Sequence, residues 1–267
     1  MIPNILTIAG TDPTGGAGIQ ADLKTFSALG GYGMSVVTAL VAQNTRGVDR
    51  VFDVPADFVR AQLDSVFADA RVDAVKIGML GDVDVIKTVA GALDDHSPPH
   101  VVLDPVMVAK SGDRLLRPDA VATLRDVLVP RASLITPNLP EAADLLGEPE
   151  ATTADAMAAQ LHRLGVLGVS RILLKGGHLR GEHSTDLLLA DGTVHRFDAE
   201  RVDTVNTHGT GCTLSSAIAT LRPQRGDWLT AVSEAKAYLT GTLRHADELD
   251  VGGGHGPVHH FHELWER

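Results

Sequence analysis

Short apolar runs alternate with longer amphipathic segments along the whole chain, and this alternation restricts the fold more than any other feature. The apolar runs contain few charges, as expected for strands that are buried on both faces of a sheet. Strands that alternate with helical segments are typical of a parallel sheet with helices packed on its faces. The predicted strands are residues 5–9, 36–42, 74–77, 101–103, 134–136 and 172–175.

The longer segments predict helices. In residues 57–69, for example, apolar side chains recur at spacings that keep them on one face, and Pro55 precedes them. Another helix is expected to begin near Ile19. The remaining predicted helices are residues 83–93, 121–128, 154–164, 214–221 and 228–243.

One segment departs from the alternation. Residues 185–189 and 194–197 are both strand-like, and Asp191 and Gly192 between them favour a tight hairpin turn. We therefore expect one antiparallel hairpin in an otherwise parallel sheet. No repeat or flexible linker divides the chain, so residues 1–267 are predicted to form a single α/β domain.

The charge balance argues against nucleic acid as a partner. The chain has 34 acidic and 23 basic residues, a formal net charge of -11, and no basic cluster interleaved with aromatic residues. Its one cysteine, Cys212, has no partner for a disulfide within the chain, which favours a reducing compartment. No signal peptide and no run of about 18 apolar residues is present, so we expect a cytoplasmic protein that does not enter a membrane.

Ligands of open α/β sheets bind beyond the carboxyl ends of the strands, so the segments that follow the apolar runs are candidates for chemistry. The first is Gly10 to Gly18, GTDPTGGAG, where four glycines precede a helix and can let the backbone approach an anion or polar group. The alternative is an irregular loop without a ligand.

Residues 16–21 also match G-x-G-x-x-A, which keeps a dinucleotide-dependent oxidoreductase open as an alternative. Two details disfavour it. Residues 11–15 stand between the strand and the match, and Gln43 and Asn44 stand where a ribose-binding acid is needed. A P-loop motif is absent from the sequence, so a phosphate would have to be bound in another way.

Residues 206–212, NTHGTGC, offer that other way. Gly209 and Gly211 let the amides of residues 209–212, including Thr210, converge on one negative oxygen at the start of a helix. This is a candidate anion hole for a transferring phosphoryl group. Cys212 in the first helical turn is predicted to have a lowered thiol pKa and to accept a proton from an alcohol. Its alternative is a small buried side chain that packs under the helix.

Lys175 ends the sixth predicted strand and is followed by Gly176 and Gly177. A cation there can extend along nucleotide phosphates and neutralise charge as the bond breaks. The alternative is a surface lysine before a glycine turn.

Asn138 and Glu141 follow the fifth predicted strand with the spacing of a helix capping box. The same amide and carboxylate can organise Mg²⁺ through water, and one residue can serve both purposes. Asp104, which ends the fourth predicted strand before Pro105, is a second candidate ligand, with a strand-end turn residue as the alternative.

Two further segments are weaker candidates. Residues 110–112 are polar and flexible enough to form a lid that excludes water. The tail carries His259, His260 and His262, but without the spacing typical of a zinc site, so we favour a docked terminal segment.

These motifs together resemble the hydroxymethylpyrimidine/phosphomethylpyrimidine kinases of thiamine biosynthesis, a branch of the ribokinase-like superfamily. The resemblance is carried by GTDPTGGAGIQADLKTFSALG, TALVAQNTRGV, KIGML, TPNLPEA, KGGH, NTHGTGC and GPVHHFH, which span nearly the whole chain. It implies a three-layer sandwich in which helices flank a mostly parallel sheet on both faces. It also implies ATP- and Mg²⁺-dependent phosphorylation of the pyrimidine's hydroxymethyl group and then of the monophosphate. A homodimer is usual for the family.

The resemblance also assigns roles. Gln43 would pair with the ring nitrogen and amino group of the pyrimidine, and Cys212 would be the base. Lys175 would bind phosphate, with Gly209, Thr210 and Gly211 as the anion hole. The other implied positions are Gly10, Asp22, Met79 and Val106 for the acceptor, Thr207, Gly177, Asn138 and Glu141 for the nucleotide, and Asp104 and Glu141 for the metal.

An alternative within the same branch is a pyridoxal or pyridoxine kinase, or dual activity, because those acceptors are also heteroaromatic alcohols. The amide of Gln43 favours the pyrimidine. In sugar kinases of the superfamily an Asp occupies the position of Cys212. The cysteine therefore changes the expected substrate from a sugar to a heteroaromatic alcohol, and kinase activity is still expected.

Overall fold

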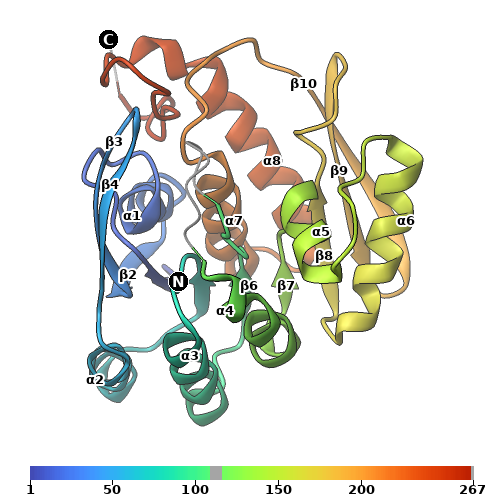
Figure 1. Cartoon of the computed structure of the whole chain (residues 1–267). Helices are drawn as coiled ribbons and strands as arrows, with labels where there is room; N and C mark the ends of the chain where they lie inside the picture. Colours follow the sequence, from blue (N-terminus) through green and yellow to red (C-terminus); the bar gives the residue numbers. More distant parts are fainter. Residues whose placement is uncertain (109–115, 266–267) are drawn as a thin grey trace.

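The computed structural model describes residues 1–108 and 116–265, so the predicted lid at residues 110–112 lies outside the described residues. Eight strands form one sheet in the order β10-β9-β8-β7-β6-β5-β1-β2 (Figure 1). From β8 to β2 all neighbouring strands are parallel, while β9 is antiparallel to both β8 and β10. The strands are β1 (Asn4–Ala9), β2 (Tyr32–Val37), β5 (Ala74–Ile77), β6 (Val101–Leu103), β7 (Leu134–Ile135), β8 (Arg171–Lys175), β9 (His183–Ala190) and β10 (Thr193–Glu200).

Helices cover both faces of this sheet, and each face has its own apolar core. One core includes Leu63, Ile86 and Leu161 and lies under α2, α3, α4, α5 and α6. The other includes Phe26 and Ile218 and lies under α1, α7 and α8. This confirms the predicted three-layer α/β architecture. The helices are α1 (Gly18–Ala28), α2 (Ala56–Asp69), α3 (Val83–His96), α4 (Pro118–Thr123), α5 (Leu139–Leu146), α6 (Ala154–Leu164), α7 (Thr210–Leu221) and α8 (Trp228–Arg244).

The strand predicted at residues 36–42 is wrong. The chain turns at Thr38, so β2 ends before it and β3 (Ala39–Asn44) leaves the large sheet. The backbone N–H of Thr38 donates to the Ala9 carbonyl at 3.0 Å, and its hydroxyl donates to the Met79 carbonyl at 2.7 Å. These bonds tie the turn to the ends of β1 and β5. β3 then pairs antiparallel with β4 (Gly47–Asp53), a ribbon that the sequence pattern did not predict.

The predicted hairpin is confirmed by β9 and β10. Its two turn residues, Asp191 and Gly192, have φ angles of 49° and 77°, which the Asp-Gly pair tolerates. Among the described residues no helix is both long enough and apolar enough to cross a bilayer.

The histidine-rich tail docks as predicted. His259 and His260 are buried, and burial lowers the pKa of His260 to about 3. The His260 ring contacts the Thr213 hydroxyl at 3.1 Å, while Tyr238 donates to the His260 carbonyl at 2.7 Å. Within the described part of the chain, no three His, Cys, Asp or Glu residues gather as a metal site would require. The tail therefore closes the fold around the start of α7.

Candidate active site

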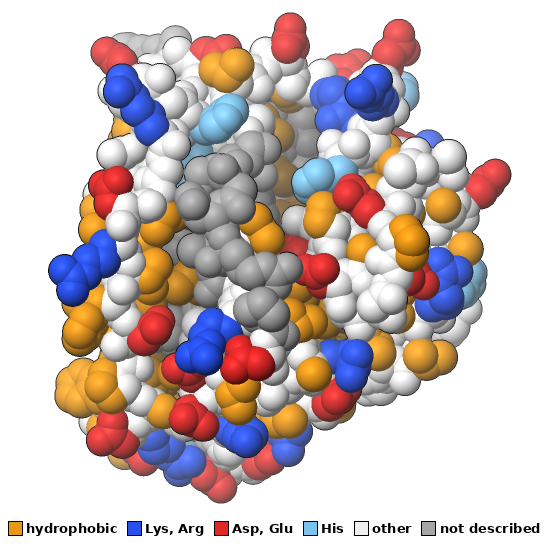
Figure 2. All heavy atoms as spheres, viewed as in Figure 1, with side chains coloured by type: hydrophobic (Ala, Val, Ile, Leu, Met, Phe, Trp, Pro, Cys, Tyr) orange, Lys and Arg blue, Asp and Glu red, His pale blue; other side chains and the backbone are white. Residues whose placement is uncertain are grey.

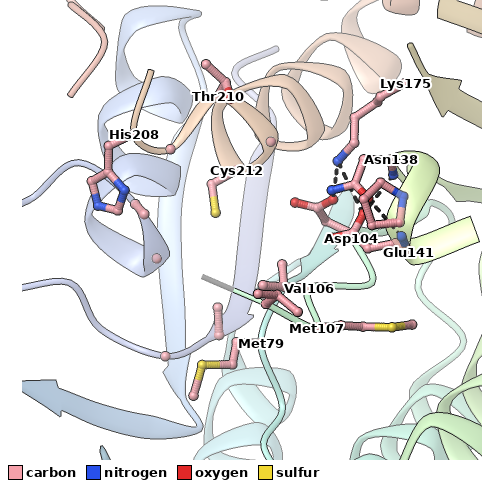
Figure 3. A pocket seen from close by; sticks show the side chains of 18 of the residues that line it. Met79, Asp104, Val106, Met107, Asn138, Glu141, Lys175, His208, Thr210 and Cys212 are labelled. Atoms are coloured by element: carbon pink, nitrogen blue, oxygen red, sulfur yellow. Dashed lines mark hydrogen bonds and ion pairs between the residues drawn. The ribbon is translucent and has the colours of Figure 1, made fainter. Parts of the chain in front are cut away.

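A cavity of about 430 Å³ opens where the parallel strands end (Figure 3). Its floor is formed by the residues that end or follow β1, β5, β6 and β8, and its walls come from β3, α5 and the first turn of α7. This is the position expected for a ligand site in an open α/β sheet.

The start of α7 forms one end of the cavity. Gly209 precedes the helix with a φ angle of 81°, and a Cβ atom there would collide with the Gly16 carbonyl. A Cβ atom at Gly211 would lie 3.3 Å from the Lys175 ammonium and 3.4 Å from Asp104 Oδ2. Gly209 thus lets the start of α7 pack against the glycine loop, and Gly211 lets the positive end of the helix dipole approach Lys175 and Asp104 closely.

Lys175, Asp104 and Glu141 form a charged cluster at this end (Figure 3). The Lys175 ammonium donates to Asp104 Oδ1 at 2.8 Å and lies 3.9 Å from Glu141 Oε2. The Asp104 side chain is only 1% exposed and also accepts a bond from the Thr136 hydroxyl at 3.1 Å. Segments that are far apart in sequence, the ends of β8 and β6 and the start of α5, therefore place one cation near two carboxylates.

Burial and neighbouring charges give these carboxylates different acidities. Burial raises the pKa of Glu141 to about 7, against the opposing effect of Lys175, and the Asp104 charge adds to the increase. Burial alone would also raise the pKa of Asp104, but the Lys175 and Lys76 ammonium groups outweigh it and hold that pKa below its ordinary value. The cluster thus contains an ionised carboxylate and a second one that titrates near neutral pH.

Glu141 also caps α5, as predicted. Its carboxylate accepts the Asn138 N–H at 2.8 Å, and the Asn138 side chain accepts the Glu141 N–H at 2.8 Å. This reciprocal capping box fixes the glutamate at the cavity wall. The structural and chemical interpretations of the pair are therefore compatible.

Cys212 is the third residue of α7, and its side chain turns toward the cavity (Figure 3). The predicted lowering of its pKa is wrong. Burial raises the pKa of the thiol to about 11, and the Lys76 ammonium and the Gly18 N–H only partly offset that increase. The helix dipole favours the thiolate, but loss of water around the sulfur has the larger effect.

The other end of the cavity is mostly apolar. Val41, Met79 and Val106 pack together there, and Gly10 adjoins Met79. Gln43 lies on the same side of β3 as Val41 and brings an amide to this surface. A flat ring with a few polar atoms fits such a lining better than a sugar does.

The sequence as a whole matches a known family. A family model described as phosphomethylpyrimidine kinase matches residues 12–259. The chain belongs to this kinase family. Hydroxymethylpyrimidine/phosphomethylpyrimidine kinase of Escherichia coli is 60% identical over 262 residues, which cover 98% of each chain, and the enzyme of that name from Bacillus subtilis is 43% identical over 96% of this chain and 94% of its own.

Solved structures agree with this family assignment. An ADP complex of Bacillus subtilis pyridoxal kinase is similar with a TM-score of 0.91 and 37% identity, covering 99% of this chain and 100% of its own. Phosphomethylpyrimidine kinase from Clostridium difficile has a TM-score of 0.79 and 42% identity, covering 89% and 98%. This phosphomethylpyrimidine kinase family member is thus a phosphotransferase of ribokinase-like fold, and the oxidoreductase alternative fails. The fold alone does not separate pyrimidine from pyridoxal as the acceptor.

Most residues predicted for the site of this kinase lie together around the cavity, and two do not. Those that line it are Gly10, Gln43, Met79, Asp104, Val106, Asn138, Glu141, Lys175, Thr207, Gly209, Thr210, Gly211 and Cys212. Their individual roles remain predictions.

Asp22 and Gly177 lie outside the lining. Asp22 is fully buried on α1, where it accepts hydrogen bonds from Lys76 at 2.8 Å, Thr7 at 2.6 Å and Ser216 at 2.7 Å. Its partner Lys76 lines the cavity, and the role predicted for Asp22 at the acceptor stays a prediction. Gly177 is exposed beyond the end of β8, and its carbonyl accepts a bond from Arg201 at 3.0 Å.

Several polar residues that were not predicted from the sequence also line the cavity of this kinase, namely Thr11, Lys76, Asp144, His178 and His208. Asp12 is fully buried in the glycine loop, and its carboxylate lies 2.7 Å from His208 Nε2, which lines the cavity. An aspartate within a glycine-rich turn often binds the turn's own amides, and that tendency was the available signal. Its pairing with a histidine 196 residues away was not visible in the sequence.

Proposed function

We propose that this protein uses ATP to phosphorylate 4-amino-5-hydroxymethyl-2-methylpyrimidine and then its monophosphate, which gives the diphosphate used in thiamine biosynthesis. The observation that carries the proposal is that one cavity has a charged end and a mostly apolar end. Lys175 and the start of α7 suit a phosphoryl group, while Gln43 and Met79 suit an aminopyrimidine. The relatives named for these two activities support the choice of acceptor.

In the first step the hydroxymethyl oxygen attacks the γ-phosphorus of ATP, and the bond from that phosphorus to the bridging oxygen of ADP breaks. Lys175 and the amides of Thr210 and Gly211 neutralise the negative charge on the phosphoryl oxygens during the transfer. Cys212 accepts the hydroxyl proton. Because burial raises the pKa of this thiol to about 11, its thiolate is scarce at neutral pH, so charge neutralisation and positioning contribute more than the base.

In the second step the nucleophile is a phosphate oxygen that is already ionised. It needs no proton acceptor, so Cys212 has less to do, whereas the phosphoryl group still needs Lys175 and the α7 amides. The two steps therefore share the charged end of the cavity and differ in their need for the thiol.

Mg²⁺ fits this cluster as a partner of nucleotide phosphates. Mg²⁺ commonly binds one or two carboxylates and takes its other ligands from phosphate and water. Asp104 and Glu141 supply two such carboxylates beside Lys175. The ion would neutralise phosphate charge, and ionised Glu141 would be needed to hold it.

Pyridoxal is the second candidate acceptor. A pyridoxal kinase from Staphylococcus aureus, solved in complex with AMP-PCP and pyridoxal, is similar with a TM-score of 0.90 and 30% identity, covering 99% of this chain and 95% of its own. The amide of Gln43 favours the pyrimidine, since one donor and one acceptor match its ring nitrogen and amino group.

A coupled assay of ADP release tests the proposal. We expect turnover with the hydroxymethylpyrimidine and with its monophosphate, weaker turnover with pyridoxal, and none with ribose. Turnover on pyridoxal alone would assign the second function, and no release with any of the four would refute the kinase mechanism derived above.

We further propose that the chain is a single domain that works as a homodimer in the cytoplasm. Exposed apolar side chains on the β3–β4 ribbon and α2 support the dimer, since Leu40, Phe52 and Phe58 are 51%, 57% and 62% exposed. Figure 2 shows apolar side chains gathered on this side of the molecule. Light scattering after gel filtration would show a monomer if this proposal is wrong.

A further inference from the structure

The segment between α8 and the docked histidines is rich in glycine. Residues 252–257, GGGHGP, contain four glycines among six residues, and we call them the C-terminal strap. Figure 1 shows the C-terminal part of the chain beside the tip of the β3–β4 ribbon. Glycine loses more conformational freedom on folding than any other residue, so this composition destabilises the fold unless close contacts require it. The strap makes such contacts on both of its sides.

On one side the strap binds the ribbon. The Gly254 N–H donates to Thr45 Oγ1 at 3.1 Å, and the His255 N–H donates to the Thr45 carbonyl at 2.9 Å. A Cβ atom at Gly254 would collide with that carbonyl, so only glycine allows the two backbones to approach this closely. Thr45 directly follows β3, whose residue Gln43 lines the cavity. The strap therefore holds the end of the strand that carries the acceptor's amide.

On its other side the strap binds the turn that precedes α7. The Gly256 N–H donates to Asn206 Oδ1 at 3.0 Å, and the Gly256 carbonyl accepts the His208 N–H at 3.0 Å. A Cβ atom at Gly256 would collide with the Asn206 side chain. His208 lines the cavity and directly precedes Gly209, where α7 begins. The strap therefore also holds the backbone that leads into the α7 amides.

A second connection between the two ends of the cavity runs through the glycine loop. The Thr11 hydroxyl accepts the Val41 N–H of β3 at 3.0 Å, and the neighbouring Asp12 carboxylate lies 2.7 Å from His208 Nε2. The turn before α7 is thus held through the His208 backbone by the strap and through the His208 ring by the loop. Loss of the strap contacts alone should therefore shift this turn by a small distance without releasing it.

We propose that the C-terminal strap is a positioning segment, which sets the separation between the acceptor and the transferring phosphoryl group by holding the end of β3 and the turn before α7. None of residues 252–257 lines the cavity, so the strap acts on the ligands through these neighbours and not by direct contact. The inference rests on the proposed function, because it takes the apolar end of the cavity as the acceptor site and the charged end as the phosphoryl site.

Phosphoryl transfer is sensitive to this separation. The attacking oxygen and the phosphorus must be held about 3–3.5 Å apart and in line, and a misplacement of about 1 Å can slow a reaction by about a hundredfold. Binding of each ligand alone depends on contacts at its own end of the cavity, so a small shift between the ends leaves both affinities nearly unchanged. The strap should therefore influence kcat and not Kd, whereas a segment that only stabilises the fold would change neither in the folded protein.

Gly254→Ala tests this role, because the new methyl group has to displace the backbone of Thr45. We expect kcat to fall by about tenfold for the acceptor that the unmodified protein turns over fastest. Calorimetry should give Kd values within about twofold of those of the unmodified protein, for that acceptor alone and for AMP-PCP with Mg²⁺ alone. Gly47→Ala is the matched control and should keep the full kcat, since it lies on the same ribbon and its methyl group would enter open space.

Two results would overturn the inference. A folded Gly254→Ala protein with unchanged kcat would show that the strap only stabilises the fold. A Kd that rises by as much as kcat falls would show that the strap supports one ligand site alone. Absence of turnover on every acceptor in the unmodified protein would instead refute the proposed function, and the following measurement does not depend on turnover.

Amide hydrogen exchange, followed by mass spectrometry, tests the connection itself. Gly254→Ala changes the ribbon side of the strap, so exchange in residues 206–209 on the opposite side should become about fivefold faster. Gly256→Ala serves if Gly254→Ala fails to fold, because its methyl group first meets the flexible side chain of Asn206. It should speed exchange in residues 44–47 by a similar factor. Unchanged exchange on the far side of the strap in the folded variants would refute the connection.

Discussion

The two ends of the cavity are built by different physical means. At the phosphoryl end, Lys175 ends β8, Asp104 follows β6 and Glu141 lies on α5, and the three compensate one another's charge. At the acceptor end, Met79 and Val106 supply an apolar surface beside the amide of Gln43. Charged groups stabilise a transition state best when their positions are fixed before the reaction. A ring, in contrast, is recognised by its shape and by a few polar atoms.

This difference separates the effects of substitutions. A change at the phosphoryl end should slow both phosphorylations, because each transfers the same group. A change near the acceptor's hydroxyl should slow the two steps unequally, because the two nucleophiles differ.

Lys175→Met removes the cation of the phosphoryl end. We expect kcat/KM to fall by about a thousandfold for both acceptors, as with loss of one preorganised donor to a developing charge. Steady-state ADP release on the hydroxymethylpyrimidine and on its monophosphate measures the loss. Lys87→Met, on the exposed face of α3, is the control and should keep full activity. A loss confined to one acceptor would break the division between the two ends.

Cys212→Ala removes the proton acceptor and leaves the charged cluster in place. We expect the first step to fall by about a hundredfold and the second by less than about tenfold. Because burial raises the pKa of the thiol to about 11, the first step in the unmodified protein should also continue to accelerate with pH above 8. Equal losses on the two steps would remove the thiol from the mechanism.

Glu141 makes the phosphoryl end sensitive to pH. With a pKa raised to about 7 by burial, it is protonated at pH 6 and ionised at pH 8, so rates on both acceptors should rise across that window if the carboxylate is needed. Glu141→Gln keeps the capping box, since Gln is also favoured at that position, and should be about tenfold slower than the unmodified protein at pH 8 without the rise. A persistent rise in this variant would assign the titration to another group.

The same pKa gives an opposite trend for stability. A carboxyl group whose pKa is higher in the folded than in the unfolded state stabilises the fold while it is protonated. Its contribution to the free energy of unfolding is full below the unfolded value and is lost as pH rises through about 7. Thermal unfolding of the Glu141→Gln variant should show a flatter dependence on pH over this range.

Much of the fold follows from local patterns. The apolar runs of β1, β5 and β8 and the amphipathic period of α6 depend on side chains close together in the chain. The turn at Thr38 does not, because its stabilising bonds come from Ala9 and Met79 on other strands. The continuous apolar run of residues 36–42 therefore predicted a single strand, whereas tertiary contacts divide it between β2 and β3.

The candidate site shows the same limit. The glycines before α7 and the position of Lys175 at a strand end follow from sequence, since backbone freedom and strand polarity are local properties. The acidity of Cys212 depends on burial and on Lys76, 136 positions earlier, so a rule for helix termini gave the wrong direction. The buried ion pair of Asp22 with Lys76 likewise depends on a residue 54 positions away, so the position of Asp22 outside the cavity lining did not follow from local sequence.

Gly211→Ala tests most directly whether the first turn of α7 holds the phosphoryl group. The backbone there is helical, so alanine is tolerated, and we expect the free energy of unfolding to change by less than about 1 kcal/mol. The new methyl group would stand 3.3 Å from the Lys175 ammonium, in the space assigned to phosphate oxygens. We predict that kcat/KM falls by at least about tenfold for both acceptors in a folded protein. Full activity of this variant on both acceptors would contradict the assignment of the first turn of α7 as the phosphoryl site, because the phosphoryl group would then be bound elsewhere in the cavity.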